Sequence, residues 1–368
     1  MNRHPESEQE SRRYGPIPFF DTHCDAVMKV LAGEADFLSG EGNAHVTLPA
    51  LLEGQIAVQV FACFVLSEQH PGCEMQQAFS VLDTILGWIE RSGGRLCLVQ
   101  TSRDLAIRCK PGSQVAAVLA LEGGDPLQGC AENLRAFSRR GVRLIIPAWK
   151  DNAFSGTAFG TNTPLTPEGI KLIAIAEEER VGVDVSHLSD RAFDDVARAA
   201  RRPFLASHSN CRALCPHPRN LDDRRLRMLA EQGGVVGINF SPLFLDPAVY
   251  DGARPFYATL LDDVSNEASR RCAADALEHV PSCDPHWIAR HIRHAIQVGG
   301  EDCVGLGGDL DGIPILPTGF DSVADYPLLI PLLDQAGLNT RQIEKVAYGN
   351  FARLFEELLP ASDAHQTE

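Results

Sequence analysis

Eight stretches of this sequence have the composition of buried β-strands, and helical segments separate most of them. The strand-like stretches span residues 18–25, 55–66, 115–121, 141–147, 181–186, 203–207, 234–240 and 302–307. Helical periodicity is found at 75–91, 166–179, 190–200, 224–231, 287–298 and 342–358. Strands that lack a polar face and alternate with helices indicate a parallel sheet that is covered on both sides.

Eight such units in about 290 residues predict a TIM-like (β/α)8 barrel of the α/β class. The alternative is an open doubly wound sheet, but no Gly-rich nucleotide turn follows the first strand. Residues 242–283 have no clear period, and we interpret them as an insertion after strand seven. We therefore expect a disordered tail at 1–16, one barrel domain at 17–358 and a polar tail at 359–368.

Composition excludes several classes of partner. The net charge of −16 argues against binding to nucleic acid or to anionic membranes. No apolar run approaches the roughly 18 residues that would cross a bilayer, and residues 1–14 lack the apolar core of a secretory signal. The 11 cysteines form no C-x-x-C pair, which favours reduced thiols and a cytoplasmic location.

Polar side chains gather at the carboxyl ends of the predicted strands, where TIM barrels build their active sites. These residues are His23, Asp25, Glu122, His187, His208 and Asp309. Each has a simpler interpretation alone: Glu122 as a turn residue, His187 as a helix start, His208 as a turn cap, and Asp309 as a loop acid. For Asp311, the loop acid is the interpretation that we favour.

His23 and Asp25 are the strongest single pair. Residues two apart on a strand point to the same side, so an imidazole and a carboxylate project together. This pairing suits a borderline divalent metal such as zinc. Burying all six polar residues without a partner would cost several kcal/mol, and metal coordination removes that cost. The sequence therefore predicts a metal site.

Five motifs in order resemble the signatures of the membrane (renal-type) dipeptidase family of amidohydrolase-like metallopeptidases. They are Asp-Thr-His-Cys-Asp at 21–25, Leu-Glu-Gly at 121–123, Val-Asp-Val-Ser-His at 183–187, Ser-His-Ser at 207–209 with Pro-Arg-Asn at 218–220, and Gly-Gly-Asp-Leu-Asp-Gly at 307–312. The segments 165–169 and 348–354 also resemble framework motifs of this family. The similarity runs from about Phe19 to Phe355.

This resemblance implies a hydrolase with two Zn²⁺ ions per chain. By position, His23 and Asp25 would hold one ion, His187 and His208 the other, and Glu122 would bridge them. Asp309 would contact the substrate amino group and the bridging water, and Arg219 would bind the substrate carboxylate. The family is often dimeric, so the resemblance also admits a homodimer.

The sequence departs from the family pattern after strand four, where a His usually helps to polarise the scissile carbonyl. Here residues 146–154 read Ile-Pro-Ala-Trp-Lys-Asp-Asn-Ala-Phe. The position of the missing His falls on Ala148 or, with a one-residue gap, on Trp149. We expect Trp149 to line the pocket over the metals and to favour small side chains; the alternative is that Trp149 is a core or rim residue.

Three functions remain open from the sequence. The favoured one is a zinc dipeptidase for small dipeptides with free amino and carboxyl ends, which the resemblance extends to L,D-dipeptides. A second is a metallohydrolase of another small amide or ester. A third is a catalytically weak binding or accessory protein, which the missing His favours and the complete ligand set opposes.

Overall fold

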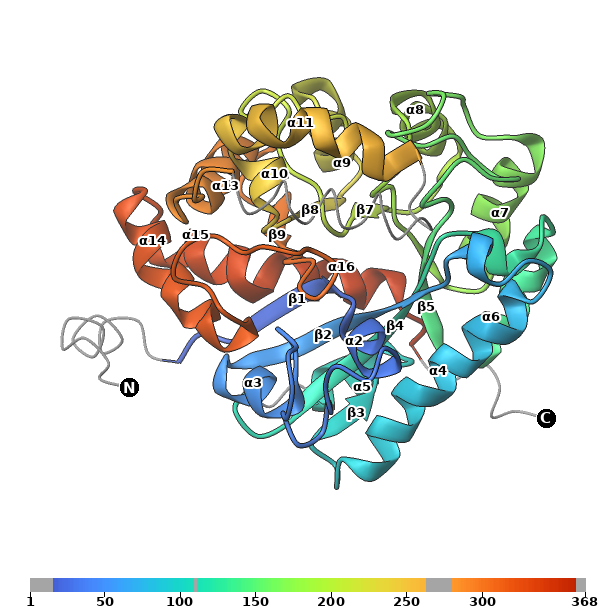
Figure 1. Cartoon of the computed structure of the whole chain (residues 1–368), viewed down its shortest axis with the longest axis horizontal. Helices are drawn as coiled ribbons and strands as arrows, with labels where there is room; N and C mark the ends of the chain where they lie inside the picture. The colour runs from blue at the N-terminus through green and yellow to red at the C-terminus, as the bar shows by residue number, and fades with distance from the viewer. Residues whose placement is uncertain (1–15, 109–110, 263–279, 362–368) are drawn as a thin grey trace.

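The computed structural model describes residues 16–108, 111–262 and 280–361 of the chain. Within them lie nine parallel strands and the helices that surround them (Figure 1). The strands are β1 (Phe19–Cys24), β2 (Ile56–Phe64), β3 (Leu96–Leu98), β4 (Val115–Glu122), β5 (Val142–Ile146), β6 (Gly182–Val183), β7 (Leu205–Ala206), β8 (Val235–Ile238) and β9 (Val304–Leu306).

Eight of the strands follow the order β6-β5-β4-β2-β1-β9-β8-β7, and β3 pairs separately with β4. The two ends of this path meet at a parallel bridge between Asp184 and Leu205, just beyond β6 and at the start of β7. The sheet is therefore a nearly closed barrel, and the predicted TIM-like (β/α)8 fold is confirmed. Each of the eight predicted strand stretches overlaps one barrel strand, and β4 extends one residue beyond its predicted stretch.

The α-helices have the bounds α2 (Ala26–Leu31), α3 (Leu48–Glu53), α4 (Glu74–Arg91), α5 (Ser102–Arg108), α6 (Leu134–Arg139), α7 (Pro167–Glu178), α8 (Asp190–Ala199), α9 (Asp223–Glu231), α10 (Pro242–Leu245), α11 (Pro247–Asp262), α13 (His286–Gly299), α14 (Leu329–Gln335), α15 (Thr340–Glu344) and α16 (Asn350–Leu358). Short helical turns lie at η1 (Ser67–Gln69), η2 (Asp125–Leu127), η3 (Ala131–Asn133), η4 (Val323–Leu328) and η5 (Lys345–Gly349). Among the described residues, none of these helices has the length and apolar character to cross a bilayer.

Some predicted segments lie wholly or partly outside the described residues. These are the N-terminal tail at 1–16 except its last residue, positions 263–279 of the predicted insertion, and positions 362–368 of the C-terminal tail. The described start of the 242–283 segment is helical, as α10 and α11.

The last helix closes the end of the barrel at which the strands begin. Phe351 of α16 contacts Phe20 near the start of β1, and Leu358 lies against Gly182 at the start of β6. The side-chain amide of Asn350 donates to the carbonyls of Glu301 and Val304, both at 2.8 Å, which fixes α16 to the start of β9. The opposite end of the barrel therefore remains for the polar residues that follow the strands.

Candidate metal centre

The six polar residues predicted from the strand ends lie together at the carboxyl end of the barrel. His23 is within β1, Glu122 ends β4, and the others lie in the segments after β1, β6, β7 and β9. Five of them are at least nine-tenths buried, namely His23, Asp25, Glu122, His187 and His208. The side chain of Asp309 is 13% exposed.

The carboxylate of Glu122 lies between two imidazoles. Its Oε2 is 3.4 Å from Nε2 of His23, and its Oε1 is 3.0 Å from Nε2 of His187. The Nε2 atoms of His187 and His208 are 2.9 Å apart. Glu122 therefore joins the histidine from β1 to the two histidines that follow β6 and β7.

A second carboxylate group lies on the other side of His23. Nε2 of His23 is 3.4 Å from Oδ2 of Asp25 and 3.9 Å from Oδ1 of Asp309. One ligand atom from each of His23, Glu122 and His208 lies within 4.8 Å of the others, and the same holds for His23, Asp25 and Asp309. His23 is common to both groups, so two potential metal positions adjoin one another.

The surroundings of Glu122, His187 and His208 favour the protonation states that bind metals. Burial raises the pKa of Glu122, but His23 and His187 outweigh it and hold this pKa well below its usual range. Burial, together with the nearby Arg219 guanidinium, lowers the pKa of His187 to about 3, and burial and His23 lower that of His208. Both imidazoles are therefore neutral, and a neutral imidazole is the form that coordinates a metal.

The pKa values of His23 and Asp309 are raised, in contrast to those of Glu122, His187 and His208. Burial disfavours a charged His23, but Glu122 and Asp25 raise its pKa well above the usual value. Burial raises the pKa of Asp309 to about 7; His23 opposes this rise, and the like charges of Asp25 and Glu122 add to it. The raised pKa of His23 shows that Glu122 and Asp25 favour a positive charge beside them, which a bound cation would also supply.

One nitrogen atom that faces the cluster fits the presence of a metal. Nε2 of His23 is buried beside Asp25 and Glu122, and within the described part of the chain it has no hydrogen-bond partner. A buried polar atom without a partner costs free energy, and buried polar groups of this kind require an explanation such as an ion. Imidazole and carboxylate together are the donors that zinc and related divalent ions prefer. The donor set fits such an ion.

A network of hydrogen bonds orients the imidazole of His208. The Ser207 hydroxyl and Nδ1 of His208 are 2.7 Å apart, which leaves Nε2 to face the cluster. The backbone N–H groups of Ser186 and Ser207 donate to Oδ1 of the buried Asp184, at 2.9 and 3.0 Å. Asp184 lies within the 183–187 motif, but the motif alone did not predict this supporting role.

Asp21 supports the opposite side of the mouth. Its Oδ1 accepts from the backbone N–H of Gly308 at 2.9 Å, and its Oδ2 accepts from the Tyr326 hydroxyl at 2.7 Å. Asp311 also has a structural function, since its two oxygens accept from the backbone N–H groups of His45 and Val46. The loop-acid interpretation of Asp311 therefore agrees with its contacts.

Arg219 lies against the histidine side of the cluster and is 3% exposed. Its Nη2 donates to the carbonyl of His208 at 3.4 Å, and its guanidinium carbon is 5.7 Å from the centre of the Phe244 ring. The loop after β7 thus brings Arg219 to the predicted metal ligand His208, although eleven positions separate the two residues in the sequence.

Trp149 is near the cluster, whereas Ala148 is completely buried. The Trp149 ring centre is 6.1 Å from that of His187 and 5.0 Å from that of Phe64. Trp149 lines a cavity of about 530 Å³ together with Glu68, Lys150 and Phe159. Ala148 leaves no open space, and Trp149 is partly buried at the edge of this cavity. The place of Trp149 in a substrate site stays a prediction.

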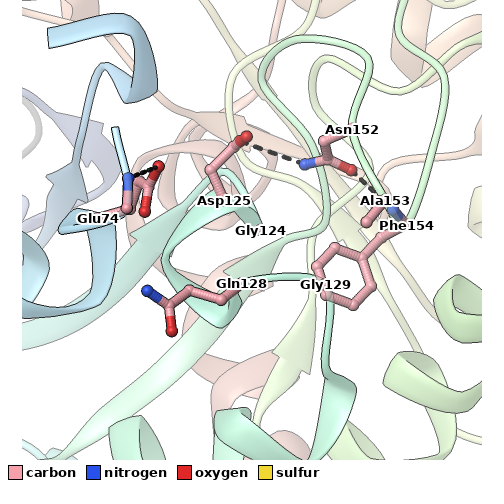
Figure 2. A pocket seen from close by; sticks show the side chains of 9 residues that line it. Glu74, Gly124, Asp125, Gln128, Gly129, Asn152, Ala153 and Phe154 are labelled. Atoms are coloured by element: carbon pink, nitrogen blue, oxygen red, sulfur yellow. Dashed lines mark hydrogen bonds between the residues drawn. The ribbon is translucent and has the colours of Figure 1, made fainter. Parts of the chain in front are cut away.

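A smaller cavity of about 330 Å³ lies on the other side of Asp125, between the start of α4 and the loop at 152–154. Figure 2 shows Asp125 accepting a hydrogen bond from the Asn152 side chain, at 3.3 Å. Asp125 borders both cavities, and none of the predicted metal ligands lines either of them.

The glycine at position 312 provides a test of how tightly the carboxylates are held. A Cβ at Gly312 would lie 2.2 Å from Oδ2 of Asp25 and 2.5 Å from Oδ1 of Asp309. We therefore expect Gly312→Ala to displace both carboxylates and to weaken metal binding by about 10- to 100-fold, measured by competition with a chelator. Gly87→Ala is the control, because no atom lies within 4 Å of its new Cβ in helix α4. Equal metal affinity in the two variants would contradict the prediction.

The sequence of the chain matches a known protein family over most of its length. The model of the membrane dipeptidase family (peptidase family M19) matches residues 8–368 of the chain. An uncharacterised protein encoded in the pqqA 5′ region of Klebsiella pneumoniae is 34% identical over 296 residues, which cover 78% of this chain and 98% of that protein.

Two solved structures extend the comparison. A metallopeptidase from Rhodobacter sphaeroides, bound to a phosphinate mimic of the dipeptide L-Ala-D-Ala, is 27% identical with a TM-score of 0.78, covering 94% of this chain and 100% of that one. The probable dipeptidase PvdM from Pseudomonas aeruginosa has a TM-score of 0.85 over 96% of this chain and 99% of that chain. Its identity of 20% shows a common fold alone.

Proposed function

Because the chain belongs to the membrane dipeptidase family and is therefore a metal-dependent hydrolase, we propose that it hydrolyses small dipeptides with free amino and carboxyl ends. The observation that carries this proposal is the position of Glu122 between His23 and His187, with Asp25, His208 and Asp309 beside them. A substrate of this cluster has to be small enough to lie beside the predicted metal ligands and the charged side chains around them.

We propose two zinc ions per chain. His23 and Asp25 would hold one, His187 and His208 the other, and Glu122 has one oxygen near each histidine group. Two adjacent divalent ions supply an activated water and polarisation of the scissile carbonyl when they are bound. The neutral state of His187 and His208 supports this assignment, because protonated imidazole does not bind a metal.

The ends of the dipeptide would be held by two charged residues on opposite sides of the cluster. Asp309 adjoins His23, so its carboxylate can accept a hydrogen bond from the substrate ammonium group. Arg219 adjoins His208, and its planar guanidinium suits a substrate carboxylate. Recognition of both ends restricts the substrate to the length of a dipeptide.

The stereochemical preference is proposed by analogy. The Rhodobacter sphaeroides metallopeptidase binds a mimic of L-Ala-D-Ala, and we extend this class of L,D-dipeptides to the present chain. We also propose a cytoplasmic enzyme, because all nine cysteines in the described part of the chain are free thiols.

The first test combines metal content with turnover. Protein prepared without chelators should contain about two zinc equivalents per chain and should hydrolyse members of a panel of small L,L- and L,D-dipeptides. Full metal content without dipeptide turnover, but with turnover of N-acyl amino acids, would favour the hydrolase of another amide. Full metal content with turnover of neither class would favour the accessory protein, which the missing His after strand four also supports.

Arg219→Ala tests recognition of the carboxylate. Loss of a charge-assisted hydrogen bond should lower kcat/KM for a dipeptide by about 10- to 100-fold. The same variant should have little effect on the corresponding dipeptide amide, which has no carboxylate. Arg225→Ala is the matched control, since Arg225 is also buried but pairs with Asp222 at the start of its own helix α9 and with Asp194 of α8. Equal losses for the two substrates would assign Arg219 a structural function.

Trp149→Ala tests whether the indole limits the size of the substrate. Removing the ring enlarges the cavity that Trp149 lines, so kcat/KM for dipeptides with bulky side chains should rise relative to that for Ala-Ala. Trp287→Ala is the control, because the Trp287 ring packs on the Arg290 guanidinium of helix α13 at 4.5 Å. An unchanged side-chain preference in Trp149→Ala would place the indole outside the substrate site.

A further inference from the structure

Asn239 follows β8 directly and has no exposed surface. Its Nδ2 donates to Oδ2 of Asp309 at 2.8 Å, and its Oδ1 accepts from the backbone N–H of Ser241 at 2.7 Å. A backbone N–H can only donate, so the amide oxygen must face Ser241. The NH₂ group is thereby directed at Asp309, and the two hydrogen bonds together determine the orientation of the amide.

The backbone of Asn239 is itself held in place by Asn210. The N–H of Asn239 donates to Oδ1 of Asn210 at 2.9 Å, and Nδ2 of Asn210 donates to the carbonyl of Asn239 at 3.0 Å. Asn210 lies two residues after His208 and is also completely buried. A chain of hydrogen bonds therefore connects the segment of His208, the end of β8 and Asp309.

Asp309 needs such support because its backbone has a φ of 59°, in the left-handed region that few non-glycine residues adopt. Its two carboxylate oxygens have different surroundings. Oδ2 is bound to Asn239, whereas Oδ1 is the oxygen that lies 3.9 Å from Nε2 of His23. One oxygen of the side chain is thus held by Asn239, and the other faces the predicted metal ligands.

We propose that Asn239 is a positioning residue, which holds Asp309 so that Oδ1 faces the metal cluster and the amino end of the substrate. The part of this proposal that concerns the substrate rests on the proposed dipeptidase function. The part that concerns the orientation of Asp309 rests on the hydrogen bonds alone.

The competing explanation is that Asn239 only stabilises the fold, as other buried asparagines do. Asn350 provides the comparison, since its Nδ2 donates to two backbone carbonyls at the opposite end of the barrel. Asn239 differs because its amide binds a charged side chain within the candidate site. The two explanations therefore predict different effects on Asp309 and similar effects on stability.

The experiment compares Asn239→Asp, Asn239→Ala and the control Asn350→Ala, each in the metal-loaded full chain. Asn239→Asp keeps the shape and the acceptor for Ser241 but replaces the donor with a carboxylate that repels Asp309. We expect crystal structures of the Asn239 variants to show the Asp309 carboxylate turned away from its present position. Asn350→Ala should lower the melting temperature and leave Asp309 in place.

Binding of a phosphinate mimic of L-Ala-D-Ala gives a second readout that does not depend on turnover. We expect Asn239→Asp to lower the affinity for the mimic by about 10- to 100-fold and to lower the affinity for an N-acetylated mimic much less. The metal content should equal that of the unsubstituted chain. An unmoved Asp309 in both Asn239 variants, or equal losses for the two mimics, would overturn the positioning role. If the unsubstituted chain binds no mimic, the dipeptidase proposal fails, and the crystal structures still test the orientation of Asp309.

Discussion

The contact of one buried carboxylate with two imidazoles is the constraint on which the mouth of this barrel depends. Glu122 is 4% exposed and has Nε2 of His187 at 3.0 Å and Nε2 of His23 at 3.4 Å. The free-energy cost of burying its charge is large unless partners surround it. Strand pairing provides this position, because Glu122 pairs with Phe64 of β2 and Ile146 of β5 at the point where all three strands end.

The segments that follow the strands need support of their own. His187 and Asp309 have φ angles of 79° and 59°, which cost free energy for residues with a Cβ. The carbonyl of His187 accepts from the backbone N–H of Ala158 at 2.8 Å, and the N–H of Asp309 donates to the carbonyl of His23 at 3.2 Å. Two buried carboxylates outside the predicted ligand set, Asp21 and Asp184, accept hydrogen bonds from backbone N–H groups next to the predicted ligands. The precision of the site thus depends on acids that take no direct part in it.

The sequence was sufficient to predict the eight barrel strands and the polar residues at their ends, because both follow from local patterns. Parallel strands end on the same side of the barrel, so the residues that follow them lie close together. This proximity can be predicted even when the individual contacts are unknown. The predicted strands at 181–186 and 203–207 are longer than β6 and β7, which have two residues each. Asp184 explains part of this difference, since its side chain accepts hydrogen bonds from the N–H groups of Ser186 and Ser207. These N–H groups therefore do not pair with a neighbouring strand.

The supporting residues could not be predicted in the same way. Asn239 binds Asp309 across 70 positions, and Tyr326 binds Asp21 across 305 positions. Neither residue lies in a motif that specifies its partner, and a buried polar residue beside an apolar run has many possible partners. The small strand β3, which pairs with β4 outside the barrel path, has only three residues and no distinctive pattern. Such features depend on the packed structure.

The residue after strand four shows how the site can differ within the family while the ligands remain. An indole has one N–H donor and cannot become a cation, so Trp149 cannot provide the positive charge that an imidazolium would offer to a developing oxyanion. Arg219 already brings a positive charge to the His187 side of the cluster, where it contributes to the low pKa of that imidazole. Trp149 instead contributes a large apolar surface between His187 and Phe64. If the missing His corresponds to Trp149, the change would exchange an electrostatic contribution for a steric one. Charge stabilisation would then fall to the proposed metal centre, and selection of the substrate to the shape of the cavity.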